Sequence, residues 1–144
     1  MQTVRERGRS SVKENEGLKL LRSVIAANED KVVYIQIGAT WCPGSRHEIP
    51  FQIEMAEAYK GQPLRLVNFY LDNRSDGTNP FAANIETYHL TDEQRLGLDP
   101  ILHTGRGIPF YILINKEGVI VDFGEHLRPS ILETSDIIDR YLKE

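Results

Sequence analysis

The residue most able to carry out chemistry in this sequence is its one cysteine, which lies in the segment Trp41-Cys42-Pro43-Gly44-Ser45. An apolar run at residues 32–37 precedes this loop, and a segment with helical character follows it. We therefore expect a buried strand, a tight turn and a helix that begins at the cysteine. Because the positive end of a helix stabilises a thiolate, the pattern predicts that the pKa of Cys42 lies below the usual value of about 8.5.

Two further side chains favour a reactive thiolate. Arg46 and His47 follow the cysteine closely and add positive charge nearby. A thiolate attacks a disulfide and forms a mixed disulfide, but Ser45 is an alcohol and cannot expel the bound partner by thiol exchange. Turnover would then need an outside thiol, such as glutathione or a second protein. The alternative is that Cys42 is a small residue in an inherited loop, without redox activity.

The remaining composition excludes several other kinds of site. With a single cysteine, no internal disulfide can form. The four histidines are too widely spread for a metal-ligand pattern, so we expect neither a metal nor another cofactor: His47, His89, His103 and His126. The net charge of −4 and the scattered aromatic residues disfavour nucleic acid as a partner. No apolar run reaches the ~20 residues of a membrane-spanning helix.

The hydrophobic pattern predicts one α/β domain with a mixed central sheet and helices on both faces. The 144 residues fit one domain at 17–144, preceded by a polar arm or linker at 1–16 that we expect to be flexible and that lacks the pattern of a secretory signal. We expect helices at 18–28, 45–59, 81–88, 92–98 and 130–142. Thr78-Asn79-Pro80 resembles a helix cap before the third of these helices, and Thr91-Asp92-Glu93-Gln94 has the order of a capping box at the start of the fourth. We expect strands at 31–38, 64–71, 108–114 and 119–123, the last two joined by a turn at 115–118.

The loop at residues 41–45, together with Pro50 and Gly107-Ile108-Pro109, resembles the thioredoxin-like superfamily and, within it, the bacterial TlpA-like thiol-disulfide oxidoreductases. The resemblance extends from about Leu18 to Leu142. It implies a thioredoxin-like fold with a short helical insertion, within residues 72–106, before the strand that follows the proline. It also implies a cis peptide at Ile108-Pro109, facing Cys42 and holding an extended substrate.

Two positions depart from the family pattern. Ser45 stands where the family has a second, resolving cysteine, and Gln36 stands where thioredoxins have a buried carboxylate. We therefore expect a monothiol enzyme in which Cys42 is the catalytic residue and the resolving position is lost at Ser45. The resemblance assigns substrate docking to the residues around them: Trp41, Pro43, Gly44, Ile108 and Pro109.

The resemblance also suggests partners and a compartment. Protein or small-thiol disulfides are the expected substrates, a further N-terminal domain outside this sequence is a candidate partner, and the periplasm or cell envelope is favoured. A second hypothesis is a redox-inactive interaction module on the same fold. A third is a protein similar to monothiol glutaredoxins, which bind glutathione and share an iron-sulfur cluster. Against the third, the basic residue expected before the cysteine is absent, and Trp41 and residues 46–50 resemble the TlpA-like branch.

Overall fold

The computed structural model describes residues 15–72, 85–102 and 107–144. Within these ranges the strands are β1 (Val32–Gly38), β2 (Leu64–Tyr70), β3 (Glu86–His89), β4 (Phe110–Ile114) and β5 (Ile120–Phe123). The helices are α2 (Glu16–Ala27), α3 (Pro43–Ala58), α4 (Asp92–Leu102), α5 (Glu133–Leu142) and the short 3-10 helix η2 (Glu125–Leu127). The arm predicted at 1–16 lies outside the described residues up to residue 14.

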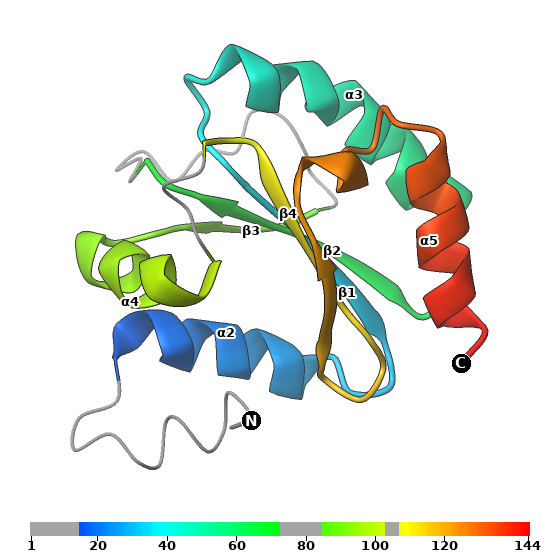
Figure 1. Cartoon of the computed structure of the whole chain (residues 1–144), viewed down its shortest axis with the longest axis horizontal. Coiled ribbons are helices and arrows are strands. Elements are labelled where there is room, and N and C mark those ends of the chain that lie inside the picture. Colours follow the sequence, from blue (N-terminus) through cyan, green and yellow to red (C-terminus); the bar gives the residue numbers. More distant parts are fainter. Residues whose placement is uncertain (1–14, 73–84, 103–106) are drawn as a thin grey trace.

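The five described strands form one mixed sheet in the order β3-β2-β1-β4-β5. The central strand β1 is parallel to β2 and antiparallel to β4, with Gly38 paired to Tyr70 and Ile37 paired to Phe110. All seven residues of β1 are buried, as expected for a central strand covered on both faces. Figure 1 shows α3 and α5 on one face of the sheet and α2 and α4 on the other.

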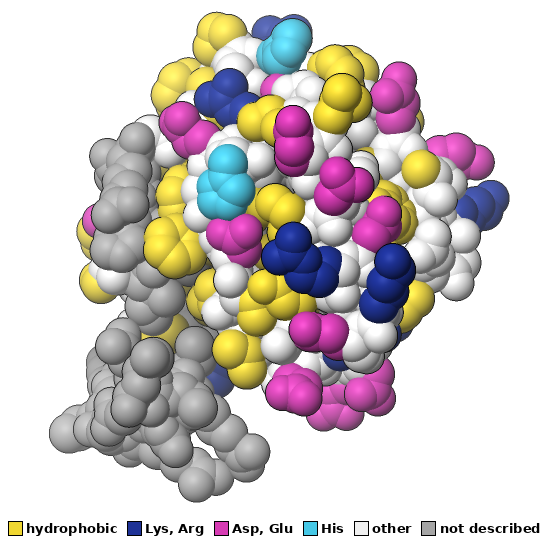
Figure 2. All heavy atoms as spheres, turned by 45° about the vertical axis from the view of Figure 1, so that its right-hand side comes forward, with side chains coloured by type: hydrophobic (Ala, Val, Ile, Leu, Met, Phe, Trp, Pro, Cys, Tyr) yellow, Lys and Arg dark blue, Asp and Glu magenta, His cyan; other side chains and the backbone are white. Residues whose placement is uncertain are grey.

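Side chains alternate along the strands, so each face of the sheet has its own core. The core beneath α2 and α4 contains Leu21, Val24, Val33, Ile35, Ile37, Val67, Phe69, Leu90, Leu98, Phe110, Ile112 and Ile114. The core beneath α3 and α5 contains Val32, Tyr34, Met55, Leu66, Ile85, Tyr111, Leu113, Leu127 and Ile138. On the side of the molecule that carries α5, acidic, basic and apolar side chains are interspersed (Figure 2).

Two local features predicted from the sequence, a helix cap and a turn, are present in the structure. The Thr91 hydroxyl accepts a hydrogen bond from the Gln94 N–H (3.1 Å), and the Gln94 side chain accepts one from the Thr91 N–H (2.9 Å), which confirms the capping box at the start of α4. The predicted turn between β4 and β5 is also present, closed by a bond from Gly118 N–H to Asn115 O (3.0 Å). Gly118 has a φ of 81°, which favours glycine.

The helix predicted at residues 81–88 is wrong for its described part. Residues 86–89 instead form β3, which pairs with Val67–Tyr70 of β2 in parallel register. The cap-like signal at Thr78-Asn79-Pro80 lies outside the described residues, and β3 depends on a partner strand far away in sequence. Helix α4 also extends past the predicted end at Leu98 to Leu102 and includes Pro100. None of the helices in the described ranges is both long and apolar enough to cross a membrane.

Candidate functional site

Cys42 lies where β1 has ended and α3 begins. It is the N-cap residue of α3, with extended backbone angles (φ −81°, ψ 121°), and Pro43 follows as the first helical residue. Proline suits this position because it has no N–H that would need a partner, and its fixed φ matches a helix. The Cys42 side chain is 9% exposed, and its sulfur lies 3.9 Å from the carbonyl oxygen of Ile108. The sequence therefore positions the thiol at the helix N-terminus, as predicted.

The Ile108-Pro109 peptide is cis, as the resemblance implied. This turn packs against the first turn of α3 at Gly44. A Cβ atom on Gly44 would lie 3.0 Å from Pro109 Cδ and 3.9 Å from Cys42 Sγ. The absence of a side chain at Gly44 thus allows Pro109 to pack closely against the first turn of α3.

Ser45 is fully enclosed, with 1% of its surface exposed, one turn into α3. Its hydroxyl oxygen accepts a hydrogen bond from the Ala39 N–H (3.2 Å), which leaves the hydroxyl proton free to be donated to Cys42. A Cβ atom on Gly38 would lie only 2.6 Å from Ser45 Oγ, so glycine is required there for the serine to fit. Ser45, which occupies the resolving position, is therefore held in place by hydrogen bonds to Ala39 and Cys42.

The pKa of the Cys42 thiol is lowered from its ordinary value. Burial alone would raise this pKa, because it disfavours the charged thiolate. Hydrogen bonds from the backbone and hydroxyl of Ser45 and from the backbone of Gly44 outweigh the burial, and the positive charge of Arg128 adds to them. Arg46 and His47 were the cations predicted near the thiol from the sequence, whereas Arg128 was not predicted.

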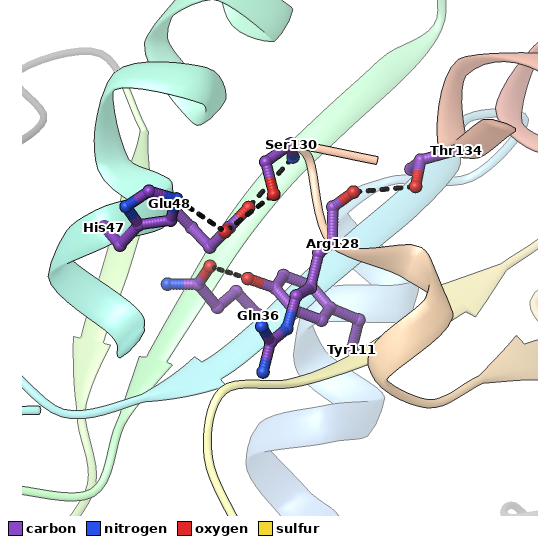
Figure 3. A network of polar contacts seen from close by, with 7 residues as sticks. All are labelled: Gln36, His47, Glu48, Tyr111, Arg128, Ser130 and Thr134. Carbon is purple, nitrogen blue, oxygen red and sulfur yellow. Dashed lines mark hydrogen bonds and ion pairs between the residues drawn. The ribbon is translucent and has the colours of Figure 1, made fainter. Parts of the chain in front are cut away.

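Gln36 lies beneath the site on β1 and is fully buried. Its Oε1 accepts a hydrogen bond from the Tyr111 hydroxyl (2.5 Å), whereas its Nε2 has no hydrogen-bond partner. Burial raises the pKa of Tyr111, and the charge of Glu48 raises it further, so the phenol stays protonated and donates. Figure 3 shows this pair within a larger polar network that includes Arg128.

Glu48 lies on α3 and is 1% exposed. Its two oxygens accept hydrogen bonds from the Ser130 N–H (2.9 Å) and the Ser130 hydroxyl (2.8 Å), and His47 Nε2 lies 3.9 Å from Oε2 (Figure 3). A buried carboxylate needs such partners. These bonds connect the helix that carries the thiol to the segment that leads into α5.

The loop before Cys42 is attached to the end of β2. Asp72 accepts hydrogen bonds from the Thr40 N–H (2.9 Å) and from the Thr40 hydroxyl. Burial tends to raise the pKa of Asp72, but these two bonds and the charge of His89 lower it overall. This contact was not predicted from the sequence, although the parallel pairing of Gly38 with Tyr70 places Thr40 and Asp72 at equal distances beyond the ends of their strands.

The structure gathers most of the predicted site residues at one end of the sheet. Cys42, Pro43, Gly44, Ser45 and the Ile108-Pro109 peptide meet there. Trp41, the residue before Cys42, is 66% exposed to solvent. Among the described residues, no group of three or more His, Cys, Asp or Glu side chains could hold a metal ion.

Comparison with known proteins gives matches among solved structures. No protein-family model and no curated protein matches the sequence. The crystal structure of a candidate thiol-disulfide oxidoreductase from Bacteroides vulgatus has a TM-score of 0.67 at 27% identity, covering 81% of this chain and 82% of that chain. A solution structure described in the same way, from the same species, has a TM-score of 0.67 at 28% identity. The match covers 83% of this chain and 78% of that chain.

A more distant similarity supports the fold alone. A thiol:disulfide interchange protein of the thioredoxin family from Chlorobium tepidum has a TM-score of 0.67 at 18% identity, covering 81% of this chain and 83% of that chain. The predicted fold class is thereby confirmed. The chain has an α/β thioredoxin-like fold that resembles bacterial thiol-disulfide oxidoreductases, and it carries a single cysteine.

Proposed function

We propose that this chain is a TlpA-like thiol-disulfide oxidoreductase of the monothiol type, with Cys42 as its reacting residue. The observation that carries the proposal is a thiol of lowered pKa at the start of α3, beside a cis proline and hydrogen-bonded by Ser45. A lowered pKa increases the thiolate fraction at neutral pH, and the thiolate is the nucleophile. A structural cysteine that is buried in apolar surroundings has a raised pKa instead.

The proposed reaction is thiol-disulfide exchange in two steps. The Cys42 thiolate attacks one sulfur of a substrate disulfide, a new sulfur-sulfur bond forms, and the other half leaves as a thiolate that takes a proton from solvent. An outside thiolate then attacks the mixed disulfide, which releases the Cys42 thiolate and leaves the outside thiol joined to the substrate. The outside thiol supplies the electrons, so no second cysteine is required.

Ser45 has a positive role in this scheme. It cannot attack the mixed disulfide, but its hydroxyl and backbone N–H stabilise the thiolate both as nucleophile and as leaving group. We assign substrate docking to the residues around the sulfur, of which Trp41 and Pro43 are exposed and Pro109 is buried: Trp41, Pro43, Gly44, Ile108 and Pro109. By the same resemblance we propose disulfide-bearing proteins or small thiols as substrates and the cell envelope as the compartment.

The proposal is tested by incubating the protein with glutathione disulfide and following its mass. We expect one glutathionyl adduct per chain, formed at Cys42 and removed by reduced glutathione. Cys42→Ser is the control and should form no adduct. A wild-type protein that forms no adduct, or forms it no faster than a free thiol does, would contradict the proposal.

Ser45→Cys tests the geometry. Because the two positions are three residues apart across the first turn of α3, the variant should form an internal disulfide in oxidising buffer and gain disulfide reductase activity. A variant that folds but keeps two free thiols under those conditions would show that the assumed arrangement is wrong.

A further inference from the structure

Arg128 is a cation at the site that the proposed exchange reaction does not itself require. It follows η2, and its carbonyl oxygen accepts hydrogen bonds from the hydroxyl of the buried Thr134 (2.7 Å) and from the Ile131 N–H (3.0 Å). These bonds hold its backbone in place. From there the side chain runs beside the Tyr111 ring toward Gln36 (Figure 3), and its charge acts on the Cys42 sulfur.

The Arg128 side chain lacks an acidic partner among the residues that the structure describes. Its Nε is buried and has no hydrogen-bond acceptor. Glu48, the buried carboxylate of the same network, accepts its hydrogen bonds from Ser130 instead. A buried donor without an acceptor costs free energy. The guanidinium charge is therefore not neutralised by a carboxylate within the described part of the chain, and such a charge favours the binding of an anion.

A second unsatisfied donor belongs to the same network. The Nε2 of Gln36 has no partner, and the whole side chain is buried. A Cβ atom on Gly38 would lie 3.5 Å from this nitrogen and 2.6 Å from Ser45 Oγ, so the amide lies directly beneath the first turn of α3. The network thus contains two buried donors without acceptors, Gln36 Nε2 and Arg128 Nε, beside a positive charge.

We infer that Arg128 binds a carboxylate of the molecule that exchanges with Cys42, so that the preferred substrates are small disulfides carrying a carboxylate close to the sulfur. This inference rests on the proposed function. A guanidinium binds carboxylates through charge-assisted, often paired hydrogen bonds. Arg128 has intermediate exposure, and its charge acts on the Cys42 sulfur, so the inference concerns short ligands that carry the carboxylate close to the disulfide. Glutathione disulfide belongs to this chemical class.

The bonds that change are those of ordinary exchange. The sulfur-sulfur bond of the ligand breaks, a bond from Cys42 to one ligand sulfur forms, and the other half departs as a thiolate with the electron pair. Arg128 takes part in binding only and does not touch the reacting sulfur atoms. It is therefore a specificity-determining residue rather than a catalytic one.

Three disulfides of similar size and different charge provide the test: dithiodipropionate is anionic, bis(2-hydroxyethyl) disulfide is neutral and cystamine is cationic. The exchange rate of Cys42 with each is divided by the rate of a free thiol, which removes the effect of the leaving group. We expect Arg128→Gln to lower the ratio of the anionic to the neutral rate about fivefold to tenfold. Arg128→Lys should keep much of the preference.

Arg140→Gln is the matched control, since Arg140 is exposed on α5. It should leave all three relative rates unchanged. A change in the thiolate fraction affects the three probes alike, so the ratio isolates recognition of charge. An unchanged ratio in folded Arg128→Gln would overturn this inference and leave the proposed function standing, whereas a wild-type protein no faster than a free thiol with every probe would overturn the proposed function.

A salt titration of the wild-type protein keeps the test decisive if Arg128→Gln does not fold. The preference for the anionic probe should fall as ionic strength rises from about 0.01 M to about 1 M, because screening weakens a partly exposed ion pair. A wild-type protein that shows no preference for the anionic over the neutral probe at low salt would overturn the inference.

Discussion

The two faces of the sheet are built from different kinds of side chain. Beneath α2 and α4 the buried contacts are aliphatic and aromatic. Asn28 is the one buried polar residue on this side within the described part of the chain, and it closes the end of α2. The other six buried polar residues of the described ranges lie on the α3 and α5 side: Gln36, Ser45, Glu48, Gln52, Asn68 and Thr134. The face with the polar interior is the one that carries the thiol.

This difference suggests that the two faces have different roles: the apolar face stabilises the fold, and the polar face positions the helix next to the thiol. An apolar contact has no preferred direction, so it stabilises the fold without fixing any atom closely. A buried hydrogen bond is directional and costly to leave unmade. The α3 face contains several such bonds, including Gln52 to Asn68 (2.8 Å) and Ser130 to Glu48 (2.9 Å), and they fix the helix that begins directly after Cys42.

The largest effect on stability is expected on the apolar face. Leu21 is fully buried in α2, so Leu21→Ala should reduce the free energy of unfolding by about 2–5 kcal/mol, measured by denaturant titration. The alkylation rate of Cys42 in the folded variant should stay at the wild-type value. Leu96→Ala is the control, because Leu96 is 72% exposed, and it should change stability by less than about 0.5 kcal/mol. A slower thiol in Leu21→Ala would contradict the separation of the two faces.

An intermediate effect is expected at Glu48. Glu48→Gln replaces one accepting oxygen by an amide donor that faces Ser130, so at least one of the two bonds is lost. The free energy of unfolding should fall by about 1–3 kcal/mol. Glu54→Gln, at an exposed position of the same helix, is the matched control. Equal stability of the two variants would show that the buried carboxylate does not hold α3 in place.

Ser45→Ala should affect reactivity more than stability. It removes the hydroxyl that stabilises the Cys42 thiolate, so the pKa of Cys42 should rise and alkylation at neutral pH should slow by about threefold to tenfold. The unfolding free energy should fall by about 1–2 kcal/mol, because the Ala39 N–H loses its acceptor. Ser23→Ala on α2 is the control and should change neither the pKa nor the rate. An unchanged pKa in Ser45→Ala would contradict the role given to the hydroxyl.

The smallest effect is expected at Asp72, and it depends on pH. Because the pKa of Asp72 is lower in the folded state, its contribution to stability is fully present above the unfolded-state pKa of about 3.9 and is lost as the pH falls through the folded-state pKa. Asp72→Asn lacks this contribution. The difference in unfolding free energy between the wild type and the variant should therefore shrink on acidification. A difference that is the same at neutral and acidic pH would contradict this account.

Local signals predicted much of the fold. The apolar run of β1, the start of α3 at Cys42 and the capping box at Thr91 depend on neighbours in sequence, and all are present. Strand β3 was missed because it forms only by pairing with β2. Its residues have intermediate burial, so they carry no strong apolar pattern.

As with the fold, the residues of the site that have a local sequence signal were predicted, and those that depend on tertiary structure were not. Cys42 and Ser45 were identified from a short motif, and the cis proline was expected from the family resemblance. Arg128 and Asp72 were not, because they reach the site through tertiary structure. The register of β1 with β2 would have suggested Asp72, whereas the charge of Arg128 acts on the thiol from a segment distant in sequence that has no local sequence signal.

The central claim is that Cys42 is maintained as a reactive thiolate. The most direct test is the pH dependence of its alkylation by iodoacetamide, compared with that of a free thiol. We predict a midpoint below the free value of about 8.5 and a raised rate at neutral pH. A midpoint at or above that value would contradict the account and would favour an interaction module without redox activity on the same fold.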